Sequence, residues 1–153
     1  MAICDLTDLP VAGPLLGLDP GAKTIGLAGC DAGRLIASPV ETLAKGRKLA
    51  PVLEYLLSIY DERGAVGLVI GLPLNMDGSE GPRVQSAKAL AHNILKAREV
   101  PIAFFDERLS SAQAERAMLE ADLSRARRAE LIDASAAAVI LQTAIDRLAN
   151  TQG

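Results

Sequence analysis

The stretch Leu15–Cys30, LLGLDPGAKTIGLAGC, decides the predicted fold because it joins two strands around a single carboxylate. Its leucines form a short buried run, and the Pro20–Gly21 pair ends that run, since proline cannot donate to a sheet ladder and Pro-Gly marks a tight turn. From Ile25 to Cys30, apolar residues alternate with small ones, which is the period-two pattern of a returning strand. Asp19 is therefore predicted at the carboxyl end of a buried strand.

Composition limits the classes of protein to which the chain can belong. Its 153 residues suit one domain with a continuous core, and 50% of them are hydrophobic. Only 3% are aromatic and none is Trp, so the core is expected to be aliphatic, and base stacking on aromatic rings is a weak model for binding. The formal net charge of −3 does not suit a general nucleic-acid binder, which leaves a local basic face as the remaining option.

The N-terminal residues 1–14, MAICDLTDLPVAGP, carry acids where a signal peptide would carry Lys or Arg. We predict a flexible lead over these residues, followed by one domain over residues 15–150. No window reaches the roughly 18 unbroken apolar residues that cross a bilayer. The two cysteines have neither disulfide-framework nor metal-type spacing. The expected location is the cytoplasm, a reducing compartment, with no membrane partner.

Strand and helix signals alternate along the rest of the chain, which predicts an α/β domain. A turn signal leads into a third predicted strand, Arg34–Ser38, which stops before Pro39. Val66–Ile70 and Ile102–Phe105 lack alternation, as expected for central strands covered on both faces. The predicted helices cover residues 48–60, 83–98, 110–121 and 129–149, the third opened by the Ser110–Gln113 capping box.

The predicted final helix carries an acid on a face of small side chains. Asp133, Ala136, Ala137, Ile140 and Ala144 share this face by their three- and four-residue spacing. Small side chains would let the helix lie close to the sheet and bring Asp133 towards the end of the first strand. The plainer interpretation, in which an acid in the first turn stabilises the helix dipole, stays open.

Three acidic points are predicted to converge: Asp19, the Asp106–Glu107 pair and Asp133. Mg²⁺ and Mn²⁺ prefer carboxylate oxygens, keep several waters and accept phosphate oxygens. Two such ions about 4 Å apart would activate a water and stabilise the departing oxygen in phosphodiester cleavage. Zinc is disfavoured because His92 stands alone. Taken singly, Asp19 is equally well explained by an Asx turn, and Asp106–Glu107 by a solvated strand exit.

The segment that contains Asp19 resembles two kinds of nucleotide phosphate-binding loop, but neither fits this chain. The segment Gly17–Thr24, GLDPGAKT, is one residue away from a Walker A loop, but Ala22 takes a glycine position. A strand pattern also follows where that motif requires a helix. The D-P-G-x-x-x-I-G pattern resembles the first phosphate loop of actin-like ATPases and sugar kinases, which need two such domains, and this chain has room for one.

Four segments, taken in order, resemble the YqgF family, also called RuvX: LLGLDPGAKTIGLA, VIGLPLNMDGSEGP, FFDERLSS and IDASAAAVILQTAID. Members of this family are pre-16S ribosomal RNA nucleases similar to Holliday-junction resolvases. The resemblance covers about residues 15–147, and GLPLNMDG and DERL are its most specific parts. It implies an α/β, RNase H-like fold with a five-stranded mixed sheet, three strands antiparallel and two parallel, flanked by helices. It also implies a metal-dependent nuclease that acts in the cytoplasm on the 5′ end of the ribosomal RNA precursor, in ribosome biogenesis.

The resemblance assigns catalytic roles to Asp19, Asp106, Glu107 and Asp133. It makes Asp19, Glu107 and Asp133 the ligands of Mg²⁺ or Mn²⁺, with two ions expected. Neighbouring strand residues point to opposite faces, so Asp106 and Glu107 are not expected to be equal ligands. We favour Glu107 as the metal-facing member.

Basic residues beside the motif loops are the candidates for contacts with substrate phosphates, which orient a strand without reading its sequence. They are Lys23, Arg83, Arg108, Arg125, Arg127 and Arg128. The last three precede the acidic helix and suggest a basic flap. The segment GLPLNMDGSEGP is expected to border the substrate groove, although a simple turn built by Asn75 and Asp77 is the plainer interpretation.

Two other functions remain open from the sequence. One is a resolvase of branched DNA, for which a homodimer would present two sites. The other is an RNA-binding or transcription-associated factor that keeps the acidic fold without turnover. Retention of all three acidic points favours the enzyme.

Overall fold

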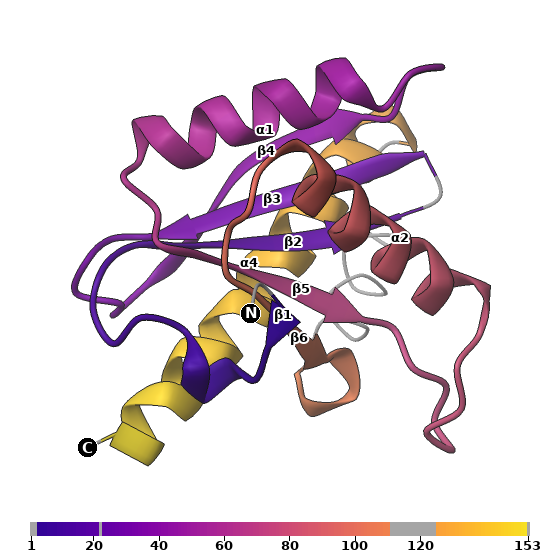
Figure 1. The fold of residues 1–153 in the computed structure, drawn as a ribbon. Helices are drawn as coiled ribbons and strands as arrows, with labels where there is room; N and C mark the ends of the chain where they lie inside the picture. The colour runs from indigo at the N-terminus through magenta and orange to yellow at the C-terminus, as the bar shows by residue number, and fades with distance from the viewer. Residues whose placement is uncertain (1–2, 22, 111–124, 153) are drawn as a thin grey trace.

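A computed structural model describes the backbone of residues 3–21, 23–110 and 125–152, and the side chains of residues 3–21, 23–110 and 134–150. Six strands form one mixed sheet in the order β1-β6-β5-β2-β3-β4 (Figure 1). The strands are β1 (Ile3–Cys4), β2 (Leu15–Pro20), β3 (Thr24–Cys30), β4 (Ala37–Ala44), β5 (Gly67–Leu72) and β6 (Ile102–Asp106). β2, β3 and β4 pair antiparallel, whereas β5 pairs parallel to β2 and β6, and β6 pairs parallel to β1.

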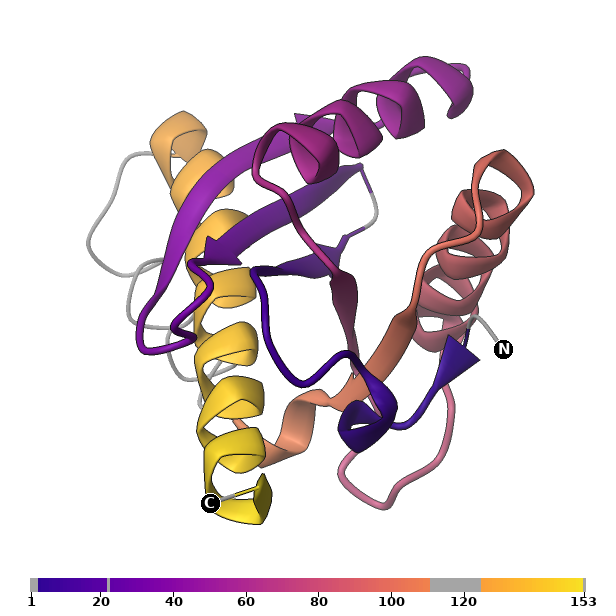
Figure 2. The ribbon, with the colours of Figure 1, turned by 60° about the vertical axis from the view of Figure 1, so that its left-hand side comes forward.

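Helices cover both faces of the sheet. α1 (Ala50–Glu62) and α2 (Pro82–Ala97) lie on one face and α4 (Arg125–Gln152) lies on the other (Figure 2). Two short 3-10 helices, η1 (Leu6–Asp8) and η2 (Glu107–Leu109), complete the described elements. Strand alternation divides the core accordingly: Leu16 and Leu18 pack towards α1 and α2, while Leu15 packs towards α4. Odd-numbered positions of β2 therefore face α4.

The third strand differs from its prediction. β4 covers Ala37–Ala44 instead of residues 34–38, and it runs through Pro39. β4 lies at the edge of the sheet, where the missing N–H of proline is tolerated. The β3–β4 register also shifts between Leu27 and Ala28, and Ala28 is the partner of Pro39. The other described strands and helices begin and end within a few residues of their predicted bounds. The helix predicted over residues 110–121 lies almost wholly outside the described residues.

Residues 3–14, which belong to the segment predicted as a flexible lead, make contacts with the rest of the fold. Ile3 in β1 pairs with Ile102 in β6, which adds a sixth strand to the five predicted. Leu9 is 2% exposed and packs in the core under α4. The Arg34 guanidinium donates to the carbonyl oxygens of Gly13 at 2.7 Å and Pro10 at 2.6 Å. A two-residue strand that pairs with a distant segment leaves no local pattern in the sequence.

Two further features concern the helices and the cysteines. None of the described helices combines the length and apolarity needed to cross a membrane. Cys4 is half-buried, Cys30 is buried, and both are free thiols. Burial is the largest cause that raises the pKa of each thiol, which keeps both protonated and poorly nucleophilic at neutral pH.

Candidate active site

Asp19 lies in β2, one residue before the end of a strand whose residues are all buried. It is 2% exposed. Asp19 and Leu15 are four residues apart in β2, so strand alternation directs their side chains to the same face of the sheet. Leu15 packs against α4, so the Asp19 side chain also faces α4. Burying a carboxylate is unfavourable without compensating partners. Such a position is typical of a functional group and unlike a solvated turn residue.

Asp106 and Glu107 have different surroundings. The Asp106 carboxylate accepts a hydrogen bond from the backbone N–H of Arg108 at 2.9 Å and pairs with the Arg108 guanidinium at 2.7 Å. The side-chain hydrogen bond from Arg108 is the largest cause that holds the pKa of Asp106 below its ordinary value. Glu107, the next residue, is only 1% exposed. The two carboxylates are therefore not equivalent, and Glu107 is the buried one.

The sheet register brings the two buried carboxylates to the same edge. Asp19 follows the last β2–β5 pair and is level with Gly71 of β5, and Gly71 pairs with Phe105 of β6, two residues before Glu107. β5 alone separates the two carboxylate-bearing strands. Two strand spacings of about 4.8 Å each separate their backbones. Gly71, between them, has no side chain, and the Ile140 side chain of α4 packs over it.

α4 lies close to this part of the sheet because glycines lie beneath it. A Cβ atom added at Gly17 would be 2.9 Å from Cβ of Leu141 and 3.2 Å from the carbonyl oxygen of Ala137. One added at Gly71 would be 2.8 Å from Cδ1 of Ile140. Asp133 is one helical turn before Ala137 in α4. The Asp133 side chain itself lies outside the described residues.

The buried carboxylates fit a hard divalent cation. Among the residues whose side chains are described, Asp19 and Glu107 are the two buried charged ones. A cation ligated by their oxygens would supply the counter-charge that buried carboxylates require. The described side chains contain no cluster of three His, Cys, Asp or Glu residues. A third protein ligand would come from the rest of the chain, to which the Asp133 side chain belongs.

The loop between β5 and α2 is held by its own hydrogen bonds and by Arg108. Asp77 Oδ1 accepts from the backbone N–H of Ser79 at 2.9 Å and from its hydroxyl at 2.6 Å. Arg108 Nη1 donates to the carbonyl oxygen of Met76 at 3.2 Å. The guanidinium that pairs with Asp106 therefore also holds the loop. The loop presents Met76, which is 80% exposed, beside the acidic end of β6.

Replacing Arg108 with glutamine is expected to loosen this loop without unfolding the protein. Arg108 is exposed, so little core packing is lost, but its ion pair and its bond to Met76 both disappear. The backbone amides of residues 76–79 should exchange with solvent several-fold faster, as measured by hydrogen exchange with mass spectrometry.

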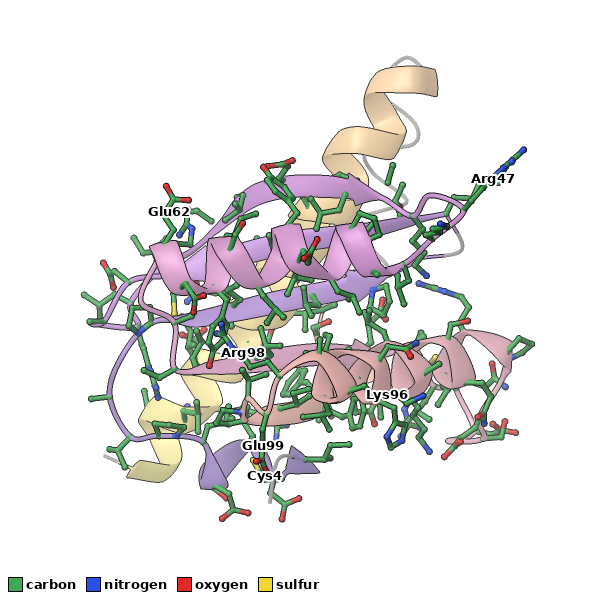
Figure 3. The ribbon with its side chains drawn as sticks, turned by 45° about the horizontal axis from the view of Figure 1, so that its top comes forward. Cys4, Arg47, Glu62, Lys96, Arg98 and Glu99 are labelled. Carbon is green, nitrogen blue, oxygen red and sulfur yellow. The ribbon has the colours of Figure 1, made fainter. Side chains whose placement is uncertain are left out.

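Arg98→Gln is the matched control for this measurement. Arg98 pairs with Asp61 at 2.6 Å, and it lies at the opposite end of α2 from the loop (Figure 3). Its replacement should leave exchange in the loop unchanged. Equal loop exchange in the Arg108 and Arg98 variants would rule out Arg108 as the anchor of the loop.

Three basic residues surround the turn that follows β2. Lys23, which is exposed, lies in the turn. Arg83 in the first turn of α2 donates to the carbonyl oxygen of Pro20 at 3.4 Å. Lys45 Nζ donates to the carbonyl oxygen of Gly21 at 2.6 Å. The sequence predicts Lys23 and Arg83 but misses Lys45, which β3–β4 pairing brings to the turn. The KGRK run that contains Lys45 was the signal that could have identified it.

Several predicted residues have no described side chains. Arg125, Arg127 and Arg128 lie in the first turn of α4, but their side chains, like that of Asp133, fall outside the described residues. The Ser110–Gln113 capping box extends into residues 111–124, which are also outside them. The roles assigned to these residues stay predictions.

Curated relatives match nearly the whole chain. A protein of Rhodobacter capsulatus named "Putative pre-16S rRNA nuclease" is 56% identical over 142 residues, which cover 93% of this chain and 89% of that protein. A protein of Phenylobacterium zucineum with the same name is 51% identical over 156 residues, which cover 98% of this chain and 99% of that protein. The similarity therefore extends over the whole domain and is not confined to one motif.

Solved structures share the fold at low sequence identity. Thermus thermophilus RuvC in complex with Holliday junction substrate gives a TM-score of 0.56 at 15% identity, covering 91% of this chain and 97% of that chain. The yeast mitochondrial Holliday junction resolvase gives a TM-score of 0.54 at 12% identity, covering 96% and 84%. These similarities confirm the predicted RNase H-like α/β fold, with β1 as an added strand.

The family model for RuvX, described as Holliday junction resolvase, matches residues 13–147. The matched range includes β2 with its buried Asp19, the loop after β5, β6 with its acidic end, and most of α4. With this match, and with relatives that share more than half of its residues, the chain belongs to the RuvX family.

Proposed function

We propose that this chain is a Mg²⁺- or Mn²⁺-dependent endonuclease that hydrolyses phosphodiester bonds to mature the 5′ end of pre-16S ribosomal RNA in the cytoplasm. The observation that carries the proposal is the burial of two carboxylates, Asp19 and Glu107, at the carboxyl ends of two strands that flank β5. Membership of the RuvX family and the name shared by its relatives support a nuclease with a ribosomal RNA precursor as substrate.

Asp19, Glu107 and Asp133 are the residues proposed to hold the ions. Divalent ions bound by these carboxylates would activate a water molecule and stabilise the departing oxygen of the substrate. β2 and the start of η2 hold Asp19 and Glu107, and α4 is proposed to carry Asp133 towards them, so that little reorganisation would be needed when the substrate binds. Asp106 acts indirectly, because it holds Arg108 and thereby the loop after β5.

Lys23, Arg83 and Arg108 are the described side chains proposed to bind substrate phosphates. Lys23 and Arg83 lie at the turn directly after the Asp19 strand, and Arg108 directly follows Glu107. Arg125, Arg127 and Arg128 are proposed to contact phosphates from the start of α4. With a formal net charge of −3, the chain attracts a polyanion only where its cations are concentrated.

A second candidate is a resolvase of branched DNA. The description of the family model and the fold shared with RuvC favour this alternative. A homodimer would then present two sites to a four-way junction. A third candidate is a nucleic-acid-binding factor without turnover, which would bind substrate and leave it intact.

One assay separates these candidates. Purified protein is mixed with end-labelled precursor RNA or with a labelled four-way DNA junction, in Mg²⁺, Mn²⁺ or EDTA. We expect metal-dependent cleavage near the 5′ end of the mature ribosomal RNA sequence and none in EDTA. Symmetric cutting of the junction with intact RNA would support the resolvase, and binding of either substrate without cleavage in both metals would support the non-catalytic factor.

A further inference from the structure

The connection between β4 and α1 is a short cationic segment that the sequence motifs do not include. Its residues Lys45, Gly46, Arg47 and Lys48 follow the last residue of β4 directly. We call them the basic connector. Arg47 and Lys48 are exposed, and Lys45 is half-buried. Figure 1 shows the end of β4, the start of α1 and the turn after β2 at one edge of the molecule.

Lys45 joins the basic connector to the turn that follows Asp19. Its backbone N–H donates to the carbonyl oxygen of Lys23 at 2.8 Å, and its Nζ donates to the carbonyl oxygen of Gly21 at 2.6 Å. Arg83 approaches the same turn from α2 through the carbonyl oxygen of Pro20. Two cations from different elements are thus held against two successive carbonyl groups beside the buried acid.

The charges at this turn repel one another. Burial is the largest cause that lowers the pKa of Lys45, and the nearby charge of Arg83 lowers it further. No ion pair among the described residues includes Lys23, Lys45, Arg47, Lys48 or Arg83; the described pairs join Lys88 to Glu80, Arg98 to Asp61 and Arg108 to Asp106. Like charges held together, with no described ion pair to any of them, are typical of a surface that binds an anion.

We infer that the basic connector is a phosphate-binding track that guides the nucleic-acid strand from the catalytic carboxylates past the end of β4 towards the start of α1. This inference rests on the proposed nuclease function and adds to it the path of the substrate flank. From Lys45 to Lys48 the extended chain spans at most about 10 Å. That length is enough for the cations of the basic connector to meet two neighbouring phosphates of one strand.

The test is the salt dependence of binding by an Arg47→Gln/Lys48→Gln double variant. Neither side chain makes a described side-chain hydrogen bond or ion pair, so the variant should melt at the wild-type temperature. Dissociation constants for labelled precursor RNA and for a four-way DNA junction are measured in EDTA across a KCl series. Two lost phosphate contacts should reduce the slope of log K against log salt by about 1.4 to 1.8. If the two lines meet at 1 M salt, this weakens binding by roughly 15- to 30-fold near 0.15 M salt.

Lys96→Gln is the matched control, because Lys96 is an exposed lysine near the end of α2. Figure 3 shows it on that helix, whereas Arg47 projects away from the body of the molecule beyond the end of β4. The control should keep the wild-type slope. Lys45→Gln serves as a second variant, expected to reduce the slope by roughly 0.7 to 0.9 for its single contact.

The possible results separate this inference from the proposed function. If wild-type protein cleaves RNA and both connector variants keep the wild-type slope, the track is wrong and the nuclease stands. If the slopes fall as expected but no metal supports cleavage, the track stands and the nuclease is wrong. A reduced slope with RNA and an unchanged slope with the junction assigns the track to RNA. If the slope falls for both the RNA and the DNA junction, the track binds the phosphate backbone that the two substrates share.

Discussion

Replacing Asp19 with asparagine is expected to slow phosphodiester cleavage by roughly a thousandfold under saturating Mg²⁺. The substitution keeps the size of the side chain but removes one negative ligand from the buried pair. A catalytic ion contributes several kcal/mol of transition-state stabilisation. Because about 1.4 kcal/mol corresponds to a tenfold change in rate, weaker binding of the ion is expected to cost roughly a thousandfold. The measurement is the single-turnover rate on labelled precursor RNA, with wild type and variant in the same metal concentration.

Two further measurements show whether the loss is catalytic. The variant should remain folded at the assay temperature, because asparagine keeps the size of a side chain that is 2% exposed and removes its repulsion from a second buried carboxylate. Its affinity for RNA in EDTA should be unchanged, since the proposed phosphate contacts come from other residues. Asp8→Asn, at an exposed aspartate of η1, is the matched control and should cleave at the wild-type rate. Cleavage by the Asp19 variant at the wild-type rate would refute the assigned role.

The features predicted well from the sequence have local signals. The Pro20–Gly21 turn is encoded by adjacent residues, so the strand before it and the position of Asp19 at its end follow directly. Strand alternation predicts that Asp106 and Glu107 differ. The structure shows that they do, although β6 ends at Asp106 and Glu107 begins η2. Glycine and proline pairs and two-residue periodicity act over short distances, and tertiary packing does not override them here.

The features that were missed depend on which strands become neighbours. Pro39 ends a predicted strand when the sheet order is unknown, but it is acceptable within β4 once β4 is known to be an edge strand. β1 has two residues and is recognisable only from its pairing with β6. Lys45 enters the site because antiparallel pairing places the end of β4 opposite the start of β3. No sequence window contains these relations.

A second large effect is expected from Gly17→Ala, which tests whether close approach of α4 to the sheet positions the site. The added methyl group would lie 2.9 Å from Cβ of Leu141 and 3.2 Å from the carbonyl oxygen of Ala137, atoms near or in the helix backbone that cannot move aside separately. Overpacking of this kind costs about 1–3 kcal/mol, and lowers the melting temperature of a domain this size by roughly 3–10 °C.

The same substitution should reduce cleavage by the protein that remains folded. Relief of the clash requires α4 to move away from β2, and a shift of about 1 Å in a catalytic group can cost roughly a hundredfold in rate. Gly71→Ala is the matched control, because its nearest neighbour is Cδ1 of Ile140 at 2.8 Å, the end of a side chain that can rotate. Its cost in stability and rate should be clearly smaller. Equal losses in the two variants, or full activity of Gly17→Ala below its melting temperature, would mean that the catalytic geometry does not depend on how closely α4 packs against β2.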